Sequence, residues 1–212
     1  MAQSATTDTI AAIATPIGQA GIGIIRISGP ESLSILKRIF RPHRPINHFK
    51  SHRLYLGHVF DPSTGLCLDE VLATYMKAPR TYTREDVVEI NSHSGYFILS
   101  KILEVVIDSG ARLAEPGEFT LRAYLNGRID LTQAEAVVEL INSRSERGLH
   151  LASQQIRGSL KDKINTLREQ LIQFLGQIEA AIDFPDEEDT FLDREAVVKA
   201  LTQDIVPEID LL

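Results

Sequence analysis

Residues 17–29, IGQAGIGIIRISG, hold four of the chain's thirteen glycines. Glycine-rich turns bind phosphate when backbone N–H groups converge on the anion at the N-terminus of a following helix. Here the dense β-branched residues that follow Gly23 predict a strand. The glycine spacing is G-x-x-G-x-G, and no Gly-Lys-Ser/Thr occurs in the chain. Since residues 8–15 form another short apolar run closed by Pro16, the stretch predicts a β-hairpin whose glycines adopt positive φ.

Short apolar runs and turn signals continue beyond this hairpin. A Gly-Pro start predicts a helix over 31–40, and the DPSTG turn predicts a hairpin of strands 53–60 and 68–76. One more strand is expected over 86–91 and a helix over 95–109. Hairpins mixed with helices in this way indicate an α+β domain rather than a parallel βαβ series.

From about Glu118 the apolar period becomes helical. An amphipathic helix is expected over 130–143 with Asp130 as its acidic cap. A longer apolar stripe runs from Leu149 to Ile182 and needs other helices to cover it, and a further amphipathic run begins at Asp193. We therefore expect an α+β domain over 1–118 and an all-α helical bundle segment over 119–212.

Charge and composition narrow the classes of protein. The net charge is −7, and all of it lies after residue 118, because residues 1–118 contain 12 Lys/Arg and 12 Asp/Glu. An acidic helical half repels phosphate, which argues against a dedicated RNA-binding module. One cysteine fits a reducing compartment, and no stretch reads as a membrane span or signal peptide. We expect a cytoplasmic protein.

Two charged residues interrupt apolar strands. Arg26 lies on the strand face opposite its isoleucine neighbours, and Glu89 follows two valines. They either pair with each other or act as the polar anchors of a small-molecule pocket, and the spacing alone favours the pair.

The remaining polar residues give weaker signals. The six histidines are scattered along the chain, which offers little support for a metal site. His43, His48 and His52 lie in a basic loop and are expected to be solvated, and His93 is expected to make a structural hydrogen bond. The acidic run 186–189 is typical of a hydrated loop, and the alternative is that it binds a divalent cation.

Four segments together resemble one family. They are DTIAAIATPIGQAGIGIIRISG, RTYTREDVVEINSHSG, EPGEFTLRAYLNGRIDLTQAEAVVELINS and AAIDFPDEED, in that order along the chain. The chain resembles the MnmE (TrmE) family of tRNA modification GTPases. The resemblance implies an N-terminal domain similar to folate-dependent one-carbon enzymes, such as aminomethyltransferases, which dimerises and binds a tetrahydrofolate derivative in its 5-formyl or 5,10-methylene form. It also implies action with the FAD-dependent partner MnmG on carbon 5 of the wobble uridine of certain tRNAs.

By motif position, the resemblance implies that Arg26, Glu89 and Arg128 bind the folate. Arg128 stands where the family often has lysine, which keeps the charge but not the point-like geometry. The segment His93-Ser94-Gly95 stands where His-Gly-Gly is usual, which puts a close backbone approach at Ser94 in doubt.

The family's GTPase signatures are missing from this sequence. It contains no G-x-x-x-x-G-K-[ST] and no Asn-Lys-x-Asp, so we expect no GTP hydrolysis by this chain. GTP, Mg²⁺ and K⁺ would belong to an absent GTPase domain, which the family inserts close to the position of Leu212. Two other classes stay open: an interaction scaffold for MnmG or tRNA with an empty pocket, and a free-standing folate-dependent transferase.

Overall fold

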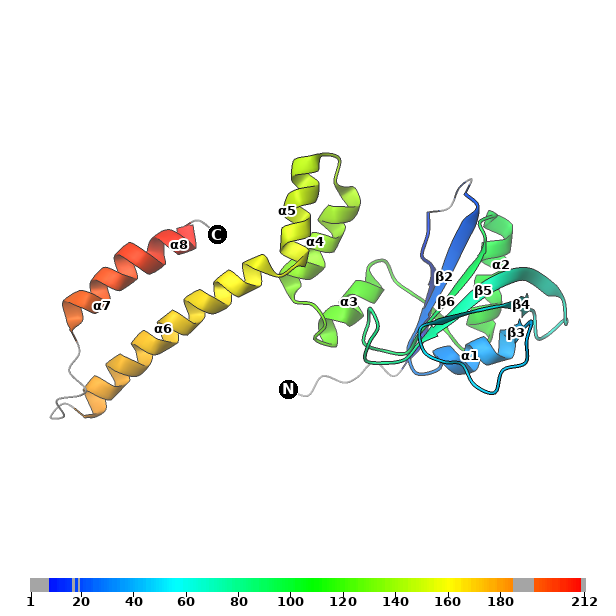
Figure 1. Cartoon of the computed structure of the whole chain (residues 1–212), viewed down its shortest axis with the longest axis horizontal. Coiled ribbons are helices and arrows are strands. Elements are labelled where there is room, and N and C mark those ends of the chain that lie inside the picture. The colour runs from blue at the N-terminus through cyan, green and yellow to red at the C-terminus, as the bar shows by residue number, and fades with distance from the viewer. Residues whose placement is uncertain (1–7, 17, 19, 185–192, 211–212) are drawn as a thin grey trace. The chain divides into compact units, whose positions relative to one another are not determined.

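The computed structural model describes residues 8–16, 18, 20–184 and 193–210 (Figure 1). The chain divides into two compact units, Met1–Ile129 and Asp130–Leu212. Within the described residues, no helix combines the length and the apolar character that crossing a membrane requires.

The first unit is built on a mixed sheet of seven strands among the described residues. The strands are β1 (Ile10–Ile13), β2 (Ile22–Ser28), β3 (Phe40–Pro42), β4 (Arg53–Phe60), β5 (Cys67–Met76), β6 (Val87–His93) and β7 (Arg112–Leu113). Their order in the sheet is β3-β4-β5-β6-β2-β1-β7, and β7 runs parallel to β1 while the other neighbours are antiparallel. The two predicted hairpins and the α+β class are therefore confirmed.

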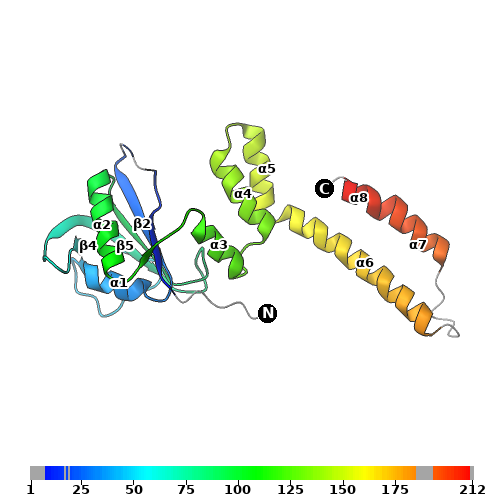
Figure 2. The same ribbon diagram turned by 180° about the vertical axis from the view of Figure 1, so that it is seen from behind.

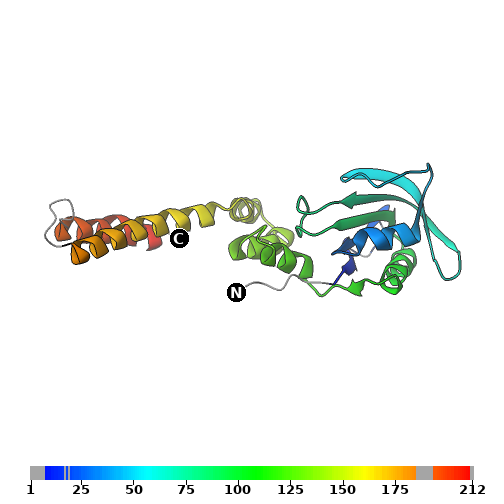
Figure 3. The same ribbon diagram turned by 90° about the horizontal axis from the view of Figure 1, so that it is seen from below.

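Two helices cover one face of this sheet. They are α1 (Ser32–Ile39) and α2 (Tyr96–Asp108), and they lie in front of the strands in Figure 2 and below them in Figure 3. Their buried aliphatic side chains, including Ile35 and Ile102, pack with the inward residues of the strands into one core. The opposite face keeps large apolar side chains exposed, namely Ile22, Leu54, Leu56 and Leu72.

The glycines of the first hairpin act differently from the prediction. Neither Gly21 nor Gly23 has a positive φ, so that expectation is wrong for both residues. A Cβ at Gly23 would lie 2.5 Å from Leu99 Cδ1, so α2 packs so closely on β2 that a side chain at this position would displace Leu99. Positive φ occurs instead at Gly29, with φ +132°.

The basic loop after α1 contains a short strand that the sequence did not predict. Gly57 explains why β3 can lie so close to β4. A Cβ at Gly57 would come within 2.3 Å of Arg41 O and 2.6 Å of Phe40 Cζ. The pairing places Pro42 opposite Gly57 and Arg41 opposite His58.

A third helix, α3 (Glu118–Leu125), belongs to the first unit, so the boundary falls after Ile129 and not after Glu118 as expected. Buried Arg122 of α3 explains the difference. Its guanidinium contacts Asp8 at 2.9 Å and Glu85 at 3.2 Å, and both residues lie in the first unit. The change of hydrophobic period at Glu118 marks the first helix after the sheet and not the domain boundary.

The described part of the second unit is entirely helical. Its elements are α4 (Leu131–Asn142), α5 (Glu146–Ile156), α6 (Ser159–Asp183), α7 (Arg194–Ala200), the π-helical turn η2 (Leu201–Ile205) and α8 (Val206–Asp210). Asp130 caps α4 as predicted, since its side chain accepts a hydrogen bond from Gln133 N in a capping box. Asp193 likewise caps α7.

The long apolar stripe is not one helix. It is divided between α5 and α6 at Gly158, which has φ +86°. Along α6 the stripe is largely uncovered within the described residues: Leu167 is buried, whereas Ile164, Leu171 and Ile182 are exposed. The acidic run 186–189 lies outside the described residues.

Candidate functional site

Arg26 and Glu89 are direct partners across β2 and β6. The Arg26 Nε donates to Glu89 Oε1 at 2.8 Å, and Arg26 Nη2 lies 2.7 Å from the same oxygen. The pairing that the spacing favoured is thus confirmed. Glu89 Oε2 accepts no hydrogen bond from the residues that the structure describes, so one carboxylate oxygen remains available for a ligand.

Aromatic rings surround this ion pair. The Arg26 guanidinium carbon lies 5.7 Å from the ring centroid of Phe119 and 6.0 Å from that of Tyr82. The guanidinium carbon of Arg128 lies 4.8 Å from the same Tyr82 ring. All three distances are within the range of cation–π attraction. Tyr82 is therefore next to both arginines. Their two guanidinium carbons cannot be farther apart than the sum of their distances to the Tyr82 ring centroid.

The end of α3 determines the position of Arg128. Gly127 has φ +69°, and its N–H donates to Tyr124 O while Arg128 N–H donates to Ala123 O, both at 2.9 Å. These two bonds form a Schellman motif, which needs a left-handed residue at the position of Gly127. The Asn-Gly-Arg sequence thus ends the helix and directs the chain so that Arg128 reaches Tyr82.

The start of α3 is held by a separate network of charges. Glu118 accepts hydrogen bonds from Arg112 at 2.7 and 3.0 Å, from Arg122 at 3.0 Å and from Glu115 N at 2.8 Å. The hydrogen bonds from Arg112, followed by those from Glu115 N and Arg122, lower the pKa of Glu118 to about 2 against the opposing effect of burial. This network fixes the helix turn that carries Phe119.

A cavity of about 510 Å³ adjoins Tyr82 and Arg128. Its lining also includes Arg80 and Arg84, so three arginines line one hollow. Arg84 has φ +59°, and its Nη1 donates to Asn126 O at 3.0 Å. Arg80 and Arg84 of the RTYTRED segment could not be assigned to the site from the sequence, because strand and helix periodicity says nothing about side chains in this loop.

His93 makes the structural hydrogen bonds that were expected. Its backbone N and its Nδ1 each lie 2.8 Å from an oxygen of Asp69. The neighbouring Ser94 hydroxyl donates to the carbonyl of Ala20. These contacts connect the end of β6 to β5 and to the loop before β2.

His43 is exposed, as predicted, but it is not isolated from the other histidines. This side chain lies 3.1 Å from Glu70 Oε1, and its ring centroid lies 4.8 Å from that of His58. The residues are far apart in sequence, and only the register of β3, β4 and β5 brings them together.

Comparison with known proteins agrees with both units. Residues 9–128 match the family described as GTP-binding protein TrmE N-terminus, and residues 131–212 match the MnmE helical domain. Proteins named tRNA modification GTPase MnmE are similar to this chain: 54% identical from Syntrophobacter fumaroxidans and 49% from Thermoanaerobacter pseudethanolicus. These matches cover 96% and 97% of the chain but 44% and 45% of the relatives. A Streptococcus pneumoniae relative is 48% identical, with 93% of the chain and 43% of the relative covered.

The fold and the matches define a protein with a mixed-sheet domain followed by a helical domain. The chain belongs to the MnmE (TrmE) family of tRNA modification GTPases and contains that family's N-terminal domain and residues of its helical domain. It spans less than half the length of the curated relatives given above.

Proposed function

We propose that this chain is the folate-binding, dimer-forming part of a GTPase that modifies tRNA. The observation that carries the proposal is the Arg26–Glu89 pair beside Tyr82, with Arg128 on the same ring and a cationic cavity next to it. Phe119 also contacts Arg26. Together these five residues from separate segments combine a carboxylate, cations and aromatic faces.

The chemistry of a reduced folate suits this arrangement. A pterin ring presents adjacent N–H donors along one edge, and Oε2 of Glu89, which accepts no hydrogen bond from the described residues, can accept from this edge. Arg26 would hold that carboxylate in place through its two contacts to Oε1. The benzoyl-glutamate tail is anionic, so Arg128 and the arginines of the adjoining cavity are suitable partners for it.

The wider role follows from the family. In this proposal the folate, in its 5-formyl or 5,10-methylene form, supplies a carbon to position 5 of a wobble uridine, with MnmG as the partner that acts with it on tRNA. The sheet domain would have the fold of aminomethyltransferases, and the protein would act in the cytoplasm. GTP, Mg²⁺ and K⁺ would be bound by a GTPase domain whose motifs this sequence lacks.

A homodimer through the N-terminal domain is part of the same proposal. The sheet face opposite α1 and α2 exposes Ile22, Leu54, Leu56 and Leu72. Leu56 pairs with Leu72 across β4 and β5, so their side chains lie together on that face. A second copy would cover this apolar area. Light scattering over a range of concentrations tests this, and a monomeric mass throughout would contradict it.

Calorimetric titration with 5-formyltetrahydrofolate tests the folate proposal. We expect binding by the parent chain and a loss of at least about tenfold in affinity in Glu89→Gln, because a hydrogen bond to a charged group contributes about 1.5–3 kcal/mol. Glu104→Gln is the control, since its exposed carboxylate pairs only with Lys101 among the described residues. A parent chain that binds no folate would favour the interaction scaffold instead.

A further inference from the structure

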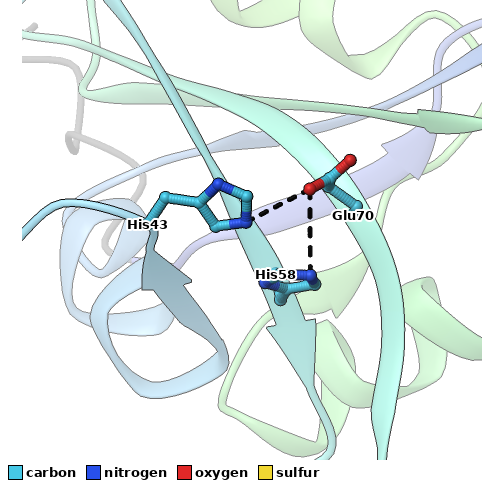
Figure 4. A group of neighbouring side chains, drawn as sticks. All are labelled: His43, His58 and Glu70. Carbon is cyan, nitrogen blue, oxygen red and sulfur yellow. Dashed lines mark ion pairs between the residues drawn. The ribbon is translucent and has the colours of Figure 1, made fainter.

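Three strands at one end of the sheet bring two histidines and a glutamate together (Figure 4). His58 on β4 is directly opposite Glu70 on β5. His43 follows β3, and its N–H donates to Leu56 O at 2.9 Å, which continues the β3–β4 ladder by one residue. His43 is therefore level with Leu56 and diagonal to His58, on the same face of the sheet.

The distances between the side-chain atoms are close to those of a metal site. Glu70 Oε1 lies 3.1 Å from His43 Nε2 and 3.9 Å from His58 Nε2. The three potential ligand atoms all lie within 4.8 Å of one another. Bonds of about 2.0–2.1 Å in a tetrahedral zinc site place ligand atoms about 3.4 Å apart. Small side-chain rotations would therefore bring all three atoms onto one ion.

A single carboxylate serves two imidazoles in this cluster. A divalent cation satisfies the carboxylate and both neutral imidazole nitrogens at once. In the single chain the side chains of His43, His58 and Glu70 are 39%, 36% and 53% exposed, so an ion can enter from solvent before a second copy covers this face.

The type of ligand atom selects the class of metal. Two nitrogens and one oxygen suit zinc and similar transition-metal ions, whereas magnesium and calcium prefer oxygen ligands alone. Among the described residues, no other group of three or more His, Cys, Asp or Glu side chains meets in this way.

Positively charged side chains near the cluster affect which fourth ligand the ion would take. The guanidinium of Arg41, which is opposite His58 in register, donates to the carbonyls of Lys37 and Arg38 at the end of α1. A hollow of about 630 Å³ lined by His43 also has Arg44, Lys50 and Arg53 in its wall. These cations repel any divalent ion, so its affinity has to come from the three ligands, and they favour an anion or water as the fourth ligand.

We propose that His43, His58 and Glu70 bind one zinc-type divalent ion, with a fourth coordination position open to water or an anion. Strands β4 and β5 fix the positions of His58 and Glu70, and the backbone hydrogen bond to Leu56 O fixes that of His43, which gives the rigidity that a metal site needs. The proposal is independent of folate binding.

Zinc titration of the untagged 212-residue chain by calorimetry tests it directly. We expect one zinc ion per chain. His58→Ala and His43→Ala should each lose affinity by a factor on the order of 100, because even outer-shell changes cost 10–100-fold. His150→Ala is the matched control, since this exposed histidine of α5 is not in the cluster and does not line the hollow beside His43, so the variant should bind zinc like the parent.

A second measurement needs no substitution. Zinc should shift the imidazole ¹⁵N resonances of His43 and His58 and leave that of His150 unchanged. Cobalt in place of zinc should give the visible absorption of a tetrahedral or five-coordinate site. Equal zinc affinity in the parent, His43→Ala and His58→Ala would overturn the proposal, and so would unchanged ¹⁵N resonances of both histidines at millimolar zinc.

Discussion

Arg26 and Glu89 are opposite each other on β2 and β6, and both contacts from Arg26 end on the same carboxylate oxygen. The strand pairing alone accounts for this meeting, since the residues are 63 positions apart. The pair is 30% and 22% exposed at the side chains, so it is neither a deep core ion pair nor a fully solvated one. Such a partly exposed pair can be both a structural contact and the anchor of a ligand.

The ion pair should contribute little to folding. We expect a double-mutant cycle of Arg26→Gln and Glu89→Gln to give a coupling free energy of about 1 kcal/mol in urea unfolding, because solvent weakens a partly exposed pair. Each single variant should nevertheless lose folate affinity. If both variants fold and bind folate like the parent, the pair is a structural contact and not part of the folate site.

Acid should weaken the attachment of α3. The hydrogen bonds from Arg112 help to lower the pKa of Glu118 to about 2 in the folded chain from an ordinary value of 4.5. The unfolded chain therefore binds more protons between these values, and the stabilisation by Glu118 is complete above the ordinary pKa and lost as the pH falls toward 2.

Urea unfolding of the parent and of Glu118→Gln measures this effect. We expect the parent to be more stable by about 2 kcal/mol at neutral pH, with a difference that shrinks as the pH falls. Glu104→Gln, at an exposed pair, should change stability by less than about 0.5 kcal/mol. A difference for Glu118→Gln that stays constant with pH would show that its ionisation is not involved.

Gly57 should tolerate no side chain. Gly57→Ala would place a Cβ against the backbone of β3, at 2.3 Å from Arg41 O, and neither strand can yield without breaking the ladder. We expect a loss of about 2 kcal/mol in the free energy of unfolding and weaker zinc binding, because His43 follows β3. Gly21→Ala, which would contact nothing within 4 Å, should be close to neutral. Equal stability of the two variants would contradict this account.

The purified chain should hydrolyse no GTP. The sequence has no G-x-x-x-x-G-K-[ST] loop to hold the phosphates. Phosphate release from GTP by the homogeneous chain should equal the buffer background. Turnover that purifies with the chain would require a nucleotide site that the sequence motifs do not reveal.

Much of the fold could be predicted from the sequence because periodicity is a local signal. The hairpins around Pro16 and DPSTG, the helix over 95–109 and the Asp130 cap all depend on neighbouring residues. The boundary after Ile129 depends on Arg122, whose partners are distant in sequence, so local pattern placed it too early. The break at Gly158 was hidden because the apolar spacing continues across it.

The candidate site was predictable in part for a related reason. A charge inside an apolar strand is visible in sequence, and this identified Arg26 and Glu89. Arg80, Arg84 and Tyr82 lie in an irregular loop, where no period shows which side chains converge. His43 and His58 meet only through strand register, which the sequence does not specify without knowledge of β3.

A crystal structure of this chain with 5-formyltetrahydrofolate would test the folate site most directly. The account predicts that the pterin edge lies within hydrogen-bond distance of the Glu89 carboxylate, with the glutamate tail toward Arg128. An ordered folate bound elsewhere, with no contact to Glu89, would contradict it.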